Sequence, residues 1–119
     1  MIDHVALHVR DFGASKSFYD RVLPAIGYEP VLTYEHATGY GKGGRPYFWI
    51  VAREPAGGPT HVALQCEERE SVDFFHAAGV AAGGKDNGAP GLRAHYHPTY
   101  YAAYVIDPDG NNMEAVCHT

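Results

Sequence analysis

The chain has 119 residues, of which 45% are hydrophobic, so it is long enough for one compact domain and too short for two ordinary ones. Its formal net charge is -5 at pH 7 and its basic residues form no run or stripe, which argues against a nucleic-acid partner. No segment approaches the roughly twenty apolar residues of a membrane helix, and the first residues lack a signal-peptide pattern, so we expect a cytoplasmic protein with no membrane partner.

The first segment alternates in polarity as a β-strand does. Its apolar row and its histidine-bearing row are Val5, Leu7, Val9 and His4, Ala6, His8. The next segment, residues 12–26, repeats apolar side chains at a spacing of four and follows Asp11, a suitable N-cap residue. The pattern therefore predicts an amphipathic helix that covers the apolar row of the first strand.

Three strand-like stretches follow, around residues 28–34, 36–40 and 47–52. The glycine-rich segment 39–44 fits the pattern G-x-G-x-x-G, but it precedes a strand-like run instead of a helix, so we interpret it as a flexible loop. Beyond a second strand at residue 61, we expect a helix over 68–82, an irregular Gly/Pro-rich loop over 83–91, and two strands. The turn signal DPDG, residues 107–110, joins those two strands.

Three matches relate the two halves of the chain. The tetrapeptide HVAL begins at His4 and again at His61. The pattern S-x-x-F-[YF] begins at Ser15 and at Ser71. Gly27 and Gly83 follow the two predicted helices. Because the three matches keep nearly the same offset, they indicate an internal repeat, residues 1–56 and 57–119, within a single domain 1–119. We expect an α+β fold in which two such units form a curled, half-open mixed sheet with the helices outside.

Side-chain parity in the last strand selects candidate site residues. Met113, Ala115 and Cys117 share its apolar side, which leaves Glu114 and His118 on the other side. If this strand lies beside the second HVAL strand, Glu114 and His61 face one space, and His4 enters from the equivalent strand of the first repeat. Two imidazoles and one carboxylate suit a first-row divalent metal ion, although such histidines can also be merely solvated or hydrogen-bonded.

The two cysteines, Cys66 and Cys117, lie in apolar strand-like stretches and are not closely spaced. This placement favours buried free thiols over metal ligands or reactive thiols.

The combination of D-H-V-A-L-H-V, S-x-x-F-Y, a second T-H-V-A-L and a terminal D-P-D-G-N-x-x-E resembles the vicinal oxygen chelate (VOC) superfamily of glyoxalase/bleomycin resistance/dioxygenase proteins. The resemblance implies two βαβββ modules in a cup-shaped sheet. It also implies a homodimer in which modules pair within or between chains, and one divalent metal ion (Fe, Mn, Zn, Ni or Co). By this resemblance the metal ligands are His4, His61 and Glu114.

One departure from the family pattern bears on the reaction. Glyoxalase I enzymes usually take a fourth ligand from the last strand of the first module, but here that strand reads YFWIVA and Glu54 lies beyond it. The three-ligand set is similar instead to that of fosfomycin-modifying thiol transferases and of extradiol dioxygenases. The latter generally contain twice as many modules.

The resemblance implies that the metal ion stabilises an oxyanion on a substrate with neighbouring oxygens. Our candidate bases are His8 and His97, and our candidate substrate-binding residues are Arg93, for an anionic group, with Trp49, Tyr100 and Tyr101. We expect a metal-dependent lyase, isomerase or thiol transferase acting on a small molecule. An extradiol-type dioxygenase and a metal-free drug- or metabolite-binding protein are the alternatives.

Overall fold

A computed structural model describes all 119 residues and contains the same order of elements twice. The first unit consists of β1 (Val5–Val9), α1 (Phe12–Val22), the short 3₁₀ helix η1 (Leu23–Ile26), β2 (Glu29–Thr33), β3 (Ala37–Lys42) and β4 (Arg45–Ala52). The second unit consists of β5 (His61–Cys66), α2 (Arg69–Ala81), β6 (Lys85–Leu92), β7 (Tyr101–Ile106) and β8 (Asn112–Cys117). Neither helix is long and apolar enough to cross a membrane.

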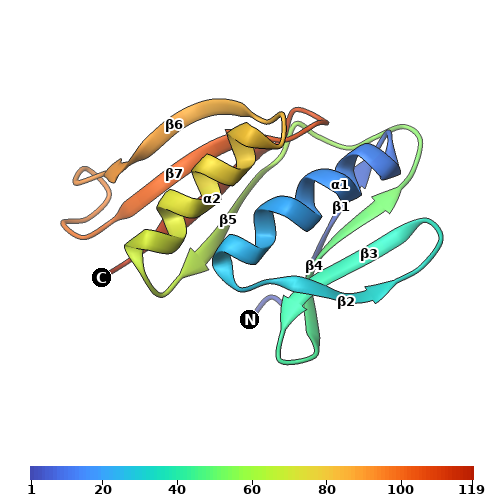
Figure 1. The fold of residues 1–119 in the computed structure, drawn as a ribbon, viewed down its shortest axis with the longest axis horizontal. Helices are drawn as coiled ribbons and strands as arrows, with labels where there is room; N and C mark the ends of the chain where they lie inside the picture. The colour runs from blue at the N-terminus through green and yellow to red at the C-terminus, as the bar shows by residue number, and fades with distance from the viewer.

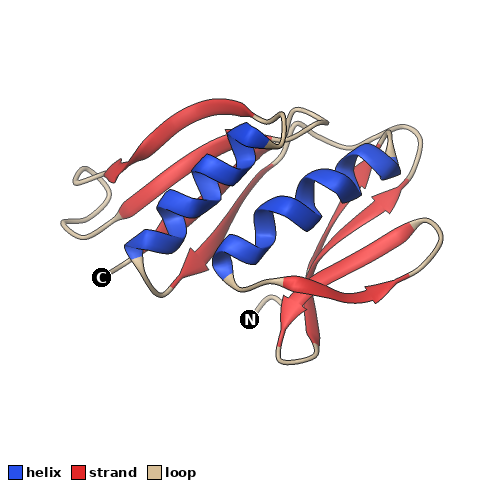
Figure 2. Ribbon diagram, viewed as in Figure 1, coloured by secondary structure: helices blue, strands red, loops and turns tan.

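Each unit forms a four-stranded mixed sheet, with the orders β1-β4-β3-β2 and β5-β8-β7-β6. The pairs β1/β4 and β5/β8 are parallel, and the other pairs are antiparallel. The two helices contact each other and lie on the same side of the two sheets (Figures 1 and 2). These observations confirm the expected α+β fold, and the sheets do not close into a barrel.

The first helix begins and ends where local chemistry requires. The carboxylate of Asp11 accepts a hydrogen bond from the amide of Ala14 at 3.0 Å, which caps the first turn as expected. The α-helix ends at Val22 because Pro24 lacks an amide proton and its ring would clash with the preceding turn. The expected helix 12–26 is therefore an α-helix followed by one 3₁₀ turn, which Gly27 closes at a φ of 81°.

Two predictions about glycine-rich segments were wrong. The segment 83–91 is mostly strand β6, and the segment 39–44 contains the end of β3, with a tight turn only at Gly43 and Gly44. The glycines in these strands mark close approach and not flexibility, because a Cβ atom at Gly39 would lie 2.7 Å from the ring of Trp49.

A single hydrophobic core joins the two units. Nineteen buried residues form one cluster between the helices and the sheets, and both units contribute to it. Cys66 and Cys117 belong to this core and form no disulfide, as predicted. Burial raises the pKa of the Cys66 thiol to about 11, so this thiol stays protonated at neutral pH.

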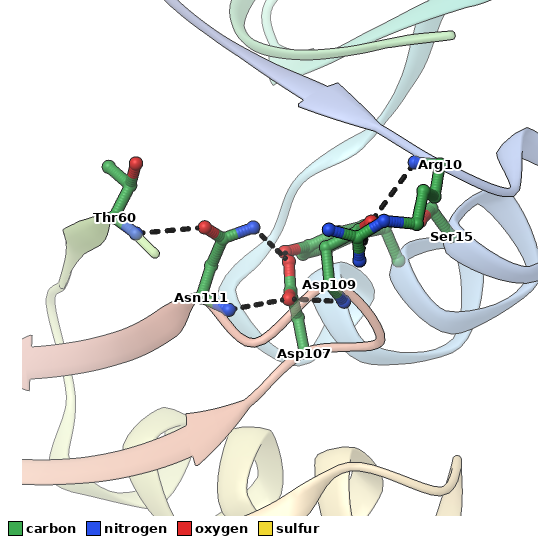
Figure 3. Close-up of polar contacts among 7 residues, drawn as sticks. Arg10, Ser15, Thr60, Asp107, Asp109 and Asn111 are labelled. Atoms are coloured by element: carbon green, nitrogen blue, oxygen red, sulfur yellow. Dashed lines mark hydrogen bonds and ion pairs between the residues drawn. The ribbon is translucent and has the colours of Figure 1, made fainter. Parts of the chain in front are cut away.

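The turn between β7 and β8 holds one carboxylate at the junction of the units (Figure 3). Asp107 is 4% exposed and accepts hydrogen bonds from the backbone amides of Asp109 and Asn111, at 2.9 and 2.8 Å. Its other oxygen accepts the side-chain amide of Asn111 at 3.0 Å and the hydroxyl of Tyr19, from α1, at 2.5 Å. Burial, together with the negative charge of Asp107, raises the pKa of Tyr19 and keeps this donor protonated.

The same turn makes further contacts with the first unit and with the residue that precedes β5 (Figure 3). Asp109 accepts the backbone amide of Arg10 at 3.0 Å and the hydroxyl of Ser15 at 3.1 Å. The side-chain oxygen of Asn111 accepts the amide of Thr60 at 2.9 Å, just before β5. The segment that the sequence marks as a turn therefore also fastens one unit to the other.

We predict that Tyr19→Phe lowers the free energy of unfolding by about 1.5–3 kcal/mol, because it removes a buried hydrogen bond to a carboxylate. Urea denaturation would measure the loss. Tyr40→Phe is the matched control: it removes a similar bond to Asp20, whose side chain is 36% exposed and also binds Lys16, so its loss should be smaller. If both variants lost the same free energy of unfolding, the buried Tyr19–Asp107 bond would contribute no more to stability than the more exposed Tyr40–Asp20 bond.

Candidate functional site

His61 and Glu114 converge on the helix-free face of the second sheet. His61 is the first residue of β5, and the parallel register with β8 pairs Ala63 with Glu114, so both side chains project from the same face. The Nε2 atom of His61 lies 2.8 Å from Oε1 of Glu114. Glu114 is 2% exposed, whereas the side chain of His61 is 53% exposed. The pair therefore joins a buried carboxylate to an imidazole that solvent and ligands can reach.

Tyr100 binds the other oxygen of the same carboxylate. Its hydroxyl donates a hydrogen bond to Oε2 of Glu114. Burial, and then this hydrogen bond, raises the pKa of Tyr100, so the hydroxyl remains a donor near neutral pH. Each oxygen of Glu114 thus has its own partner, which fixes the direction in which the carboxylate points.

The separation of His61 and Glu114 fits two ligands of one metal ion. With metal–ligand bonds of about 2.1 Å, two neighbouring ligand atoms of an octahedral ion are about 3.0 Å apart. The observed 2.8 Å between Nε2 and Oε1 is close to that value. Within one chain, however, no group of three or more His, Cys, Asp or Glu side chains is arranged to hold a metal ion.

The third expected ligand, His4, lies apart from this pair. Its Nδ1 atom is 2.7 Å from the carboxylate of Asp3. His4 borders a hollow of about 370 Å³ together with Trp49, whose ring stacks on Tyr34 with centroids 6.3 Å apart. His61 and Glu114 do not border that hollow. The expected ligands and substrate-binding residues of one chain are therefore divided between the two units.

The two candidate bases have different surroundings. His8, on β1, is partly buried, and its ring makes no hydrogen bond. In His97, Nδ1 accepts the backbone amide of Thr99 at 3.2 Å, so the proton of the neutral ring lies on Nε2, which is 2.7 Å from Nδ1 of His118. Both nitrogens of His97 are thus engaged, and the free Nε2 belongs to His118. The rings of His97 and His118 both pack edge-on against Tyr100.

Tyr101 is not part of this site. Its hydroxyl donates to Asp73 on α2 at 2.6 Å, and the guanidinium of Arg69 lies 5.1 Å from its ring centre. The side chain therefore points to the helix side of the sheet, which alternation along β7 requires once Tyr104 occupies the other side.

Two further residues, Tyr104 and His118, lie at this site, beyond the candidate bases and substrate-binding residues named from the sequence. The ring of Tyr104 lies 6.2 Å from the ring of His61, and strand pairing places Tyr104 directly opposite Glu114. His118 follows Glu114 at an even spacing, so the parity that selected Glu114 also selected His118. Arg93, a candidate from the sequence, lies over the ring of Tyr104, with its guanidinium 5.3 Å from the ring centre.

Comparison with known proteins identifies similar chains. A family model described as the Glyoxalase/Bleomycin resistance protein/Dioxygenase superfamily matches residues 1–115. A glyoxalase/bleomycin resistance protein from Albidiferax ferrireducens T118 has 32% identity and a TM-score of 0.84, with 98% of each chain covered. A family enzyme from Burkholderia phytofirmans PsJN, 21% identical over 99% of this chain and 98% of its own, shares the fold with a TM-score of 0.74. None of the curated proteins matches the chain.

We predict that Tyr100→Phe destabilises the metal-free protein by about 1.5–3 kcal/mol, because one oxygen of the buried Glu114 carboxylate loses its donor. Tyr101→Phe is the matched control, since the adjacent hydroxyl binds an exposed carboxylate and its removal should cost less than about 1 kcal/mol. Chemical denaturation of both variants measures the difference. A loss no larger for Tyr100→Phe than for Tyr101→Phe would show that Glu114 does not depend on this bond.

Proposed function

The chain belongs to the glyoxalase/bleomycin resistance protein/dioxygenase superfamily, and from that premise we propose that it is a divalent-metal-dependent enzyme. Its substrate is a small molecule with two neighbouring oxygen atoms, and its reaction is of the lyase, isomerase or thiol-transferase type. The observation that carries the proposal is the contact between the accessible imidazole of His61 and the buried carboxylate of Glu114.

His61 and Glu114 would hold the metal ion through Nε2 and Oε1. When bound, the ion supplies a Lewis acid that polarises the substrate oxygens and stabilises negative charge on them. Tyr100 keeps Glu114 aligned by binding its second oxygen. Proton transfer falls to the His97–His118 pair: His97 is held by the amide of Thr99, and His118 presents its free Nε2 beside Tyr100.

We also propose that the protein forms a homodimer in which His4 of a second copy completes the metal site. Two features support this arrangement. His4 does not join His61 and Glu114 within one chain, and the sheets of one chain are open on their helix-free faces. A second copy that faced this side of the molecule would bring His4, with the neighbouring Trp49, toward the His61–Glu114 pair.

We predict that the protein retains about one metal ion per chain after loading with Fe, Mn, Zn, Ni or Co and dialysis, and that His61→Ala and Glu114→Ala lose it. Elemental mass spectrometry measures the content. His36→Ala, at an exposed histidine outside the site, is the control and should retain the metal. Retained metal would direct activity screening to hemithioacetals, to epoxides with thiols, and to catechols with oxygen. No metal in the wild type would favour a metal-free binding protein.

Mixing two defective variants tests the shared site. His4→Ala and Glu114→Ala should each fail to retain metal. After unfolding and refolding together in equal amounts, half of the dimers contain both variants and each has one intact site, so metal should return to about a quarter of the wild-type content. A mixture that stays empty, while refolded wild type recovers its metal, would place all ligands within one chain.

A further inference from the structure

The guanidinium of Arg93 is held in a fixed position on the face that carries His61 and Glu114. Its Nη1 donates to the carbonyl of Gly91 and its Nη2 to the carbonyl of Ala89, both at 2.8 Å. The planar group also lies over Tyr104, 5.3 Å from the ring centre, in cation–π contact. Three contacts in different directions thus restrain a side chain that is flexible on most protein surfaces.

The backbone of β6 is shaped around this side chain. A Cβ atom at Gly88 would lie 2.7 Å from the ring of Tyr104 and 3.2 Å from Nη2 of Arg93. A Cβ atom at Gly91 would lie 3.2 Å from Nη1. The register of β6 against β7 also shifts on both sides of Gly88. The absence of side chains at Gly88 and Gly91 leaves room for the side chains of Arg93 and Tyr104, which explains why the pairing of β6 with β7 is irregular at this point.

No carboxylate neutralises Arg93. The chain contains 14 acidic residues against 9 lysines and arginines, yet its ion pairs involve Arg10, Lys16 and histidines only. The two carbonyls use two of the five N–H donors of the guanidinium, so three remain for a ligand. A restrained, partly buried cation with free donors in an acidic protein is suited to bind an anion.

Tyr104 connects this cation to the proposed metal site. One face of its ring lies against Arg93, its ring packs edge-on with that of His61 at 6.2 Å, and Tyr104 pairs across the strands with Glu114. A ligand bound at His61 and Glu114 can therefore extend along one aromatic ring to reach Arg93.

We propose that the substrate carries a carboxylate, which pairs with the guanidinium of Arg93 while its neighbouring oxygens lie at His61 and Glu114. This inference rests on the proposed function, because it takes the His61–Glu114 pair as the metal end of the site. It narrows the substrate class to small carboxylic acids with two adjacent oxygen atoms at the other end and an apolar or flat part between them.

Two probes that differ only in the carboxylate test the inference. 3,4-Dihydroxybenzoate has neighbouring oxygens at one end and a carboxylate at the other, and catechol lacks the carboxylate. Calorimetric titration of metal-loaded protein of known metal content should show 3,4-dihydroxybenzoate binding at least about tenfold more tightly. Arg93→Gln should bring the two affinities within about twofold while leaving that of catechol unchanged, and Arg93→Lys should keep part of the preference.

Arg21→Gln is the matched control, because it removes the same charge from the end of α1 and should preserve the preference. Circular dichroism shows whether each variant is folded. Equal binding of the two probes to wild type, or a full preference in Arg93→Gln, would overturn the inference and leave the proposed function standing.

A test with benzoate and metal-free protein distinguishes the Arg93 carboxylate site from the metal-dependent function. Ligand-observed NMR should detect weak benzoate binding that disappears in Arg93→Gln and in high salt. Binding of this kind in a protein that retains no metal would sustain the anion site and overturn the metal-dependent function. Failure of benzoate, catechol and 3,4-dihydroxybenzoate to bind would overturn both.

Discussion

The hydrogen bonds of the Asp107 carboxylate hold the two units of the chain in one arrangement. A carboxylate that is 4% exposed needs donors for both of its oxygens, and it finds them in its own turn and in Tyr19 of the other unit. Because the helices are packed together by this junction and by the shared core, they occupy one side of both sheets (Figure 1). The opposite faces of both sheets therefore carry no helix.

Much of the fold could be predicted from periodicity. Alternation in the first strand and a spacing of four in the following segment predicted β1 and α1, because the apolar rows of these elements meet in the core. Glycine-rich segments misled the prediction, since β6 and the end of β3 carry glycine where another side chain or backbone atom approaches closely. Such contacts come from neighbouring strands and leave no signal in the local sequence.

The candidate site was predictable to the extent that it depends on strand parity. Parity placed Glu114 and His61 on one face, and the contact between them agrees with that reasoning. The orientation of Tyr101 toward the helices follows from the same rule, because Tyr101 and Tyr104 are three residues apart in one strand and therefore lie on opposite faces. The position of His4 relative to the pair depends on how whole units are arranged in space, and no short-range pattern reports that arrangement.

The irregular form of β6 also bears on solubility. The outer edge strands of the two sheets are β2 and β6, and each contains a proline and a break in register, at Pro30 and at Pro90. A proline removes a backbone donor, and a shifted register interrupts the row of groups that an added strand would need. The strand that gives Arg93 its position therefore also protects the sheet against edge-to-edge aggregation, so that strand pairing with other molecules is disfavoured along the outer borders of the protein.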